Sequence, residues 1–191
     1  MKYSFCNSFA LATGLMIVCT GKMTKEIEQF VGLEKEYVAT IRLGGRTPSF
    51  DSETEVIEHC TIDDVTADAV VAALGEFVGP QIQLPPMWSA AKIDGKRLYK
   101  YARKGRLVDR RSREVFISSI TPIEIQIPDV TFNVVCSKGT YIRTLADDIG
   151  QRLGCGAYLT ALERRRIGDF RLEDAYSIDD LVEYRRSLQN V

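Results

Sequence analysis

The chain has 191 residues, 45% hydrophobic and 27% charged, which is enough for one sizeable domain with its own core. Its five cysteines contain no Cys-x-x-Cys pair and its only histidine is His59, so zinc sites, histidine-based metal sites and Ser-His catalysis lack their residues. The odd, scattered cysteines indicate free thiols in a reducing compartment, and we expect a cytoplasmic protein. The net charge of −1 by itself favours no class of partner.

The apolar residues predict elements along the whole chain. Residues 15–19, between Gly14 and Gly21, predict a buried strand; polar residues interrupt the run before it, which argues against an export signal. Helical spacing predicts helices over residues 23–30, 66–78, 96–104, 140–153 and from 177 onward. Alternating patterns predict a strand over residues 36–43 and two long strands around Pro128 that pair antiparallel, and residues 158–167 predict a short strand or a strand–helix junction. Strands dominate, with helices between them, so the predicted fold class is α+β.

Positive charge is concentrated in one part of the chain, residues 92–113, which we call the basic segment. No lysine or arginine occurs from residue 47 to residue 91, whereas the basic segment has ten against Asp94 and Asp109, a balance of +8. Such a segment in a nearly neutral protein is a candidate surface for a polyanion. The alternative is a solvated helix face with no partner.

Two further places could carry chemistry. A predicted strand ends at Cys136, the chain turns through Lys138 and Gly139, and the next helix carries Tyr141 and Arg143 in its first turn. A helix N-terminus favours anions, and an arginine there can hold a carboxylate in a bidentate pair. Tyr37 stands at the start of another predicted strand. By themselves both tyrosines could equally be packed aromatics.

Taken together, these segments resemble the TruB family of tRNA pseudouridine synthases from Leu11 almost to the end. The matching stretches are LATGLMIVCTGKMTK, KEYVATIRLG, RTPSFDSE, PPMWSAAKIDGKRLYKYARKG, CSKGTYIRTLADDIGQRLGCGAYLTALERRRIG and SIDDL. The third and fourth are typical of the branch that modifies uridine 55 in the tRNA T loop. The resemblance implies one pseudouridine synthase catalytic domain over residues 1–191, a mixed and mainly antiparallel sheet flanked by helices, incomplete at its N-terminus.

The resemblance also assigns roles to particular residues. Family enzymes flip the target uridine out of the T loop and isomerise it to pseudouridine. Tyr37 matches the aromatic that stacks on the base, Tyr141 a second pocket tyrosine, and Arg143 the partner of the catalytic aspartate. Asp51 matches a loop acid that places the substrate, and Leu162 an apolar wall. The basic segment matches an RNA-contacting insertion, in which we expect contacts from Lys92, Lys96, Arg97, Lys100 and Arg103. The implied partner is the T stem-loop of tRNA, bound by a monomer without metal, organic cofactor or membrane.

One position departs from the family pattern. Where the family has its nucleophilic aspartate, this chain has Phe9, and no Asp or Glu precedes Glu26. A phenyl ring has no lone pair for covalent catalysis, and we expect Arg143 to lack its carboxylate partner. The break between Phe9 and Leu11 is sharp, so it indicates either a genuine truncation or a misread gene start. The chain is therefore an impaired synthase, a non-catalytic tRNA-binding module or a non-functional fragment.

Overall fold

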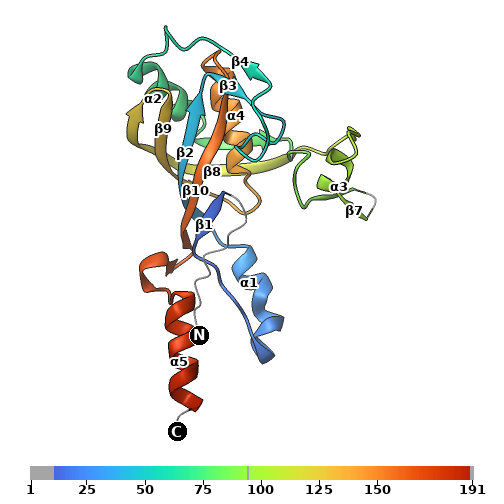
Figure 1. Ribbon diagram of the computed structural model, residues 1–191, viewed down its shortest axis with the longest axis vertical. Coiled ribbons are helices and arrows are strands. Elements are labelled where there is room, and N and C mark those ends of the chain that lie inside the picture. Colours follow the sequence, from blue (N-terminus) through green and yellow to red (C-terminus); the bar gives the residue numbers. More distant parts are fainter. Residues whose placement is uncertain (1–10, 94, 190–191) are drawn as a thin grey trace.

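A central sheet organises the computed structural model, which describes residues 11–93 and 95–189 (Figure 1). Its strand order is β1-β10-β2-β9-β8-β5, and β11 pairs with the end of β10. β1 runs parallel to β10, and the other pairs are antiparallel. The strands are β1 (Ala12–Gly14), β2 (Lys35–Leu43), β5 (Gly79–Gln83), β8 (Arg113–Gln126), β9 (Asp129–Cys136), β10 (Ala157–Ile167) and β11 (Phe170–Arg171).

Helices and two small hairpin sheets complete the fold. The helices are η1 (Gly21–Glu26), α1 (Ile27–Val31), α2 (Ala67–Glu76), α3 (Tyr99–Ala102), α4 (Ile142–Arg152), η2 (Leu172–Asp174) and α5 (Ile178–Gln189). β3 (Gly45–Arg46) pairs with β4 (Glu58–His59), and β6 (Lys92–Ile93) pairs with β7 (Lys96–Arg97). This mixed, mainly antiparallel sheet with flanking helices confirms the α+β class.

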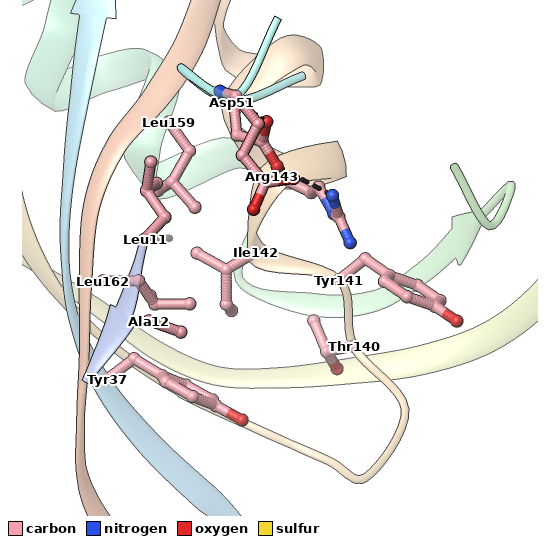
Figure 2. Close-up of a pocket in the computed structure, with 11 residues that line it drawn as sticks. Leu11, Ala12, Tyr37, Asp51, Thr140, Tyr141, Ile142, Arg143, Leu159 and Leu162 are labelled. Atoms are coloured by element: carbon pink, nitrogen blue, oxygen red, sulfur yellow. Dashed lines mark hydrogen bonds and ion pairs between the residues drawn. The ribbon is translucent and has the colours of Figure 1, made fainter. Parts of the chain in front are cut away.

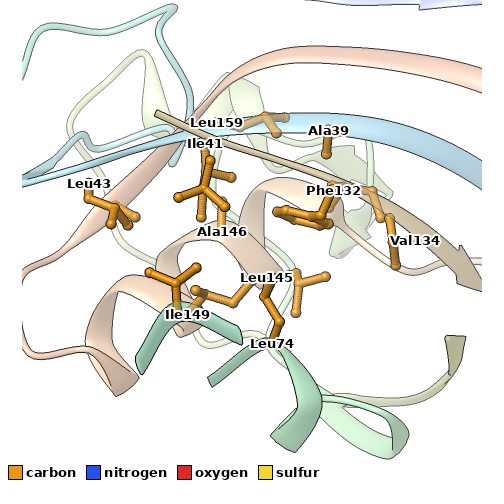
Figure 3. Close-up of a cluster of buried hydrophobic side chains, with 14 of the residues drawn as sticks. Ala39, Ile41, Leu43, Leu74, Phe132, Val134, Leu145, Ala146, Ile149 and Leu159 are labelled. Atoms are coloured by element: carbon orange, nitrogen blue, oxygen red, sulfur yellow. The ribbon is translucent and has the colours of Figure 1, made fainter. Parts of the chain in front are cut away.

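The core lies between the sheet and the α2–α4 layer (Figure 3). Alternate residues of β2 and β9 point into it because side chains alternate between the faces of a strand. The fully buried Phe132 and Ile41 face Leu145 and Ile149 of α4. Burying a side chain of this size stabilises the fold by about 1.5–3 kcal/mol, so the α4 interface is a large part of the stability.

A close approach of backbones fixes where α4 lies. Gly150 sits against Gly156 and Ala157, and a Cβ at position 150 would overlap backbone atoms of both residues. The amides of Cys155 and Gly156 donate to the Gly150 carbonyl, at 3.2 and 3.0 Å. The missing side chain therefore lets the end of α4 meet the start of β10.

Two local predictions were wrong. Residues 15–19 are not a strand: the sheet pairing is made by β1 just before them. After Leu15 donates to the carbonyl of Arg164, no strand in the described part of the chain pairs with residues 16–19. The helix expected over residues 96–104 is shorter, because Lys96 and Arg97 pair with Lys92 and Ile93 in the β6–β7 hairpin. Only α3 remains helical there, held to the fold by the buried Leu98.

Replacing Gly150 with alanine tests the close approach. The added methyl must push α4 away from β10, so Gly150→Ala should lower the free energy of unfolding by about 1–3 kcal/mol. Gly75→Ala is the matched control, since a Cβ there meets no atom within 4 Å. Because alanine is the better helix former, Gly75→Ala should stabilise by about 0.5–1 kcal/mol. Urea unfolding measures both, and equal effects would contradict this account of the packing.

Candidate active site and RNA interface

A cavity of about 360 Å³ opens where the N-terminus of α4 faces β1, β2 and β10 (Figure 2). Its apolar wall comes from Leu11, Leu159 and Leu162, on the opposite side from Tyr141. The complete lining is Leu11, Ala12, Tyr37, Asp51, Glu53, Thr140, Tyr141, Ile142, Arg143, Leu159 and Leu162. The size falls within the usual range of small-ligand sites, which is roughly 300–1,000 Å³.

The five pocket residues expected from the sequence all line this one cavity. Tyr37 lies on β2, Leu162 on β10, and Tyr141 and Arg143 at the start of α4. Asp51 comes from the loop after β3 and forms an isolated bridge with Leu159. The structure thus brings together side chains that are up to 125 residues apart (37 to 162). Their individual roles stay predictions.

The polar side of the cavity is an ion pair between Arg143 and Asp51. Arg143 Nη1 lies 2.7 Å from Asp51 Oδ2, and the Asp51 side chain is only 6% exposed. Ser49 Oγ and the Glu53 amide also donate to Asp51 Oδ1, at 2.5 and 3.1 Å. The expectation that Arg143 lacks a carboxylate partner was therefore wrong, because the loop that carries Asp51 folds over the N-terminus of α4. Phe9 lies outside the described residues.

A second ion pair holds the same loop to the same helix. Arg46 lies 3.1 Å from Asp147, which is one helical turn beyond Arg143. The end of β3 and the loop that follows it supply a cation and then an anion, and the helix supplies their counterparts at positions 147 and 143. Shifting the loop along α4 would bring like charges together, so the two pairs define one relative position.

Tyr37 is held by Arg164, a residue that the sequence analysis missed. The two are directly opposite on β2 and β10. Burial raises the pKa of Tyr37, and the positive charge of Arg164, with a hydrogen bond from it, opposes that rise. Arg164 Nε also donates to the Leu15 carbonyl at 2.6 Å, which ties the exit from β1 to the same side chain. Burial keeps the Tyr37 hydroxyl protonated, so the ring is a neutral aromatic surface. The position of Arg164 opposite Tyr37 could have been inferred only from the register of β2 and β10.

The basic segment meets the pocket at one end only. Arg113, its last residue, places its guanidinium carbon 5.3 Å from the centre of the Tyr141 ring. A neighbouring cavity of about 350 Å³ is lined by Pro85, Ala91, Lys92, Ile93, Leu98, Asp109, Arg110, Arg111 and Arg113. The rest of the segment projects past the end of β8 around β7 and α3 (Figure 1). The five residues expected to contact RNA all lie on this projection, and none of them lines the cavity beside Tyr37 and Tyr141. They are Lys92, Lys96, Arg97, Lys100 and Arg103.

Cations outside the basic segment extend its charge toward Tyr37. Lys35 and Lys138 line an open groove of about 790 Å³ together with Arg111 and Arg113. Burial lowers the pKa of Lys35, as do its cationic neighbours Arg164 and Lys138. Neither lysine was predicted as an RNA contact, because neither lies in a run of positive charge.

The described residues contain no cluster of three or more His, Cys, Asp or Glu side chains that could hold a metal ion. Among their helices, none has the length and hydropathy needed to cross a membrane. The four described cysteines, Cys19, Cys60, Cys136 and Cys155, carry free thiols.

Comparison with known proteins supplies the family. Residues 10–142 match the family model described as TruB family pseudouridylate synthase (N terminal domain). The chain belongs to the TruB family. Residues 143–190 match the tRNA pseudouridylate synthase B C-terminal domain, and the boundary between the two matches falls inside α4.

Curated relatives of this TruB-family chain are named tRNA pseudouridine synthase B. The one from Phocaeicola vulgatus is 49% identical over 174 residues, covering 91% of this chain and 74% of the relative. That from Parabacteroides distasonis is 48% identical, covering 91% and 75%. That from Burkholderia mallei is 50% identical, covering 90% of this chain but only 56% of the relative.

Solved structures give the same fold. The match to "Crystal Structure of a Cbf5-Nop10-Gar1 Complex" has a TM-score of 0.69 and 32% identity, and covers 91% of this chain. The match to "Structure of H/ACA RNP bound to a substrate RNA containing 2'-deoxyuridine" has a TM-score of 0.68 and 28% identity, and covers 94%. This chain spans 43% of each matched chain. The expected pseudouridine synthase fold is thereby confirmed.

Removing the arginine tests the buried ion pair. Arg143→Met leaves the Asp51 carboxylate buried without its cation, so it should lower the free energy of unfolding by about 2–4 kcal/mol. The matched control is Arg42→Met, which breaks the Arg42–Asp129 pair, with side chains 49% and 39% exposed. That exposed pair should cost less than about 1 kcal/mol. Thermal or urea unfolding compares them, and equal losses would mean that Asp51 does not depend on Arg143.

Proposed function

We propose that this chain binds the T stem-loop of tRNA as a monomer and takes a flipped uridine into the cavity between Tyr37 and Tyr141. The single observation that carries the proposal is the convergence of five side chains on one cavity in a member of the TruB family. The curated relatives, named for tRNA, support tRNA as the partner. The free thiols of the described cysteines support a cytoplasmic location.

The cavity offers what an extruded base needs. Base flipping costs the stacking energy of the loop, and an aromatic partner in the pocket returns part of it, about 1–3 kcal/mol for each stacked base. Tyr37 supplies that ring, and Leu162 and Leu159 supply an apolar wall. Arg143 and Asp51 lie across the cavity from Tyr37, where the donors and acceptors of the uracil edge can meet them.

The cations outside the cavity account for affinity. Phosphates are bound by lysine and arginine with release of counterions, so binding weakens as salt increases. Arg113, which lies over the Tyr141 ring, lines both the cavity at the basic segment and the groove that also contains Lys35 and Lys138. An RNA strand following them would pass the mouth of the pocket.

The chemical step lacks a group at the position of Phe9. The family's aspartate attacks the sugar or the base while the glycosidic bond breaks, and the base then rejoins through carbon. Two carboxylates line the described cavity, Asp51 and Glu53, and Asp51 is already engaged by Arg143, Ser49 and the Glu53 amide. We therefore propose base binding without isomerisation for the chain as written.

Neutralising charges in the β6–β7 hairpin tests the RNA surface. Lys96→Gln and Arg97→Gln should each weaken binding of a T stem-loop and lower the log–log slope of affinity against salt by about one per lost phosphate contact. The control is Arg185→Gln, an equal charge change on the exposed surface of α5. Filter binding at several salt concentrations measures the slopes. A chain that binds no T stem-loop at low salt would instead be a non-functional fragment.

The chemical step is tested by tritium release from a T-loop transcript labelled at carbon 5 of uridine. The unmodified chain should release no more tritium than a reaction without enzyme, because Phe9 cannot act as the nucleophile. The Phocaeicola vulgatus relative serves as the positive control. Release by the unmodified chain would contradict this proposal and point to Glu53 or Asp51, which the variants Glu53→Gln and Asp51→Asn would then separate.

A further inference from the structure

Gln83, at the end of β5, holds the backbone of Tyr141 from both sides. Its Oε1 accepts from the Tyr141 amide at 2.9 Å, and its Nε2 donates to the Tyr141 carbonyl at 3.3 Å. Gln83 is only 2% exposed, so these bonds are shielded from water. A side-chain amide that meets the amide and the carbonyl of one residue restrains both the position and the orientation of that residue.

This contact replaces the usual start of a helix. Tyr141 is the N-cap residue of α4, and its own side chain makes no capping hydrogen bond. Amides at a helix N-terminus have no partner within the helix and need one from outside. Gln83 provides it for Tyr141. The place where α4 begins, and with it the direction of the Tyr141 ring, thus depends on a side chain of β5.

Arg113 reaches the same tyrosine from the neighbouring strand. Gln83 and Arg113 are directly opposite each other in the β5–β8 pair, where they close the excursion over residues 84–112 that contains nearly all of the basic segment. Gln83 binds the backbone of Tyr141, and Arg113 lies over its ring. Arg113 also packs on the turn before Tyr141, with Nη1 3.3 Å from where a Cβ on Gly139 would lie. Both ends of the excursion therefore meet at Tyr141.

We propose that Gln83 and Arg113 are positioning residues that couple RNA binding by the basic segment to base binding in the cavity, through Tyr141. The inference rests on the proposed function and adds the connection between its two parts. A displacement of the excursion moves the pair at its base, and that pair moves both the backbone and the ring of Tyr141. Coupling of this kind is reciprocal, so a base in the cavity also strengthens the hold of the segment on the RNA.

The test compares two T stem-loops, one with uridine at the target position and one with an abasic site there. The ratio of their dissociation constants measures base binding, separately from the phosphate contacts that both RNAs share. For the unmodified chain we expect the uridine RNA to bind about tenfold more tightly, the value of one stacked base. Gln83→Leu should leave the abasic RNA within about twofold of its original affinity and reduce the ratio to near one.

Two further variants separate positioning from stability. Gln81→Leu is the matched control, because Gln81 lies two residues earlier on β5 and donates to Phe77 instead of Tyr141. It should keep the full ratio. Arg113→Met should also lower the ratio, together with some affinity for both RNAs. The single tryptophan, Trp88, reports folding by fluorescence. If Gln83→Leu does not fold, Gln83→Glu keeps the acceptor for the Tyr141 amide but not the donor, and should give an intermediate ratio.

The outcomes are distinct. A folded Gln83→Leu or Gln83→Glu chain that keeps the tenfold ratio would overturn the coupling, since Gln83 would then only satisfy buried polar groups. Loss of the ratio in Gln81→Leu would overturn it too, because the effect would not be specific to Tyr141. If the unmodified chain binds both RNAs equally, base binding itself fails, which overturns the proposed function along with the coupling.

Discussion

The packing of α4 against the sheet is the constraint on which the site depends. One helix contributes Leu145 and Ile149 to the core and, one to two turns earlier, Tyr141 and Arg143 to the cavity. Its far end is fixed by the approach of Gly150 to the start of β10. Because a helix is rigid over eleven residues, whatever fixes its C-terminal end and its buried face also aims its N-terminal side chains. The hydrophobic core and the cavity are therefore parts of one arrangement.

Ion pairs and hydrogen bonds hold the loop after β3, which the hydrophobic core does not fix. The loop after β3 has few apolar residues to bury. It is held to α4 by the pair Asp51–Arg143 and, at the end of β3, by the pair Arg46–Asp147. The buried hydroxyls of Ser49 and Thr47 donate to the carboxylate and the carbonyl of Asp51, so the desolvated acid has several partners. Buried charges are tolerated only when they are paired and hydrogen-bonded in this way, which is why the loop takes one conformation over the cavity.

Sequence patterns predicted the parts of the fold that local chemistry determines. The alternating residues of β2, β8 and β9 and the amphipathic face of α4 were visible because their periods differ. The short β1 was missed because its pairing with β10 joins residues about 150 positions apart. The prediction of a helix over residues 96–104 was wrong because its first two residues, Lys96 and Arg97, pair in the β6–β7 hairpin. In the site, the resemblance to the family identified candidate side chains. The partner of Arg143 and the contacts of Gln83 depend on tertiary proximity, which no local sequence pattern encodes.

The balance of charge differs between the inside of the cavity and the groove outside it. Inside, the charge of Arg143 is already balanced by Asp51, and the other charged residue of the lining is the carboxylate Glu53. Outside, the groove is lined by Lys35, Lys138, Arg111 and Arg113 against one carboxylate, that of Glu114. An uncharged uracil loses little on entering such a compartment, whereas a phosphate finds its counter-charges only at the rim. Under the proposed function, this difference would orient an RNA strand with its base inward and its phosphates at the rim, and would make a small, free nucleotide a poor competitor for a long polyanion.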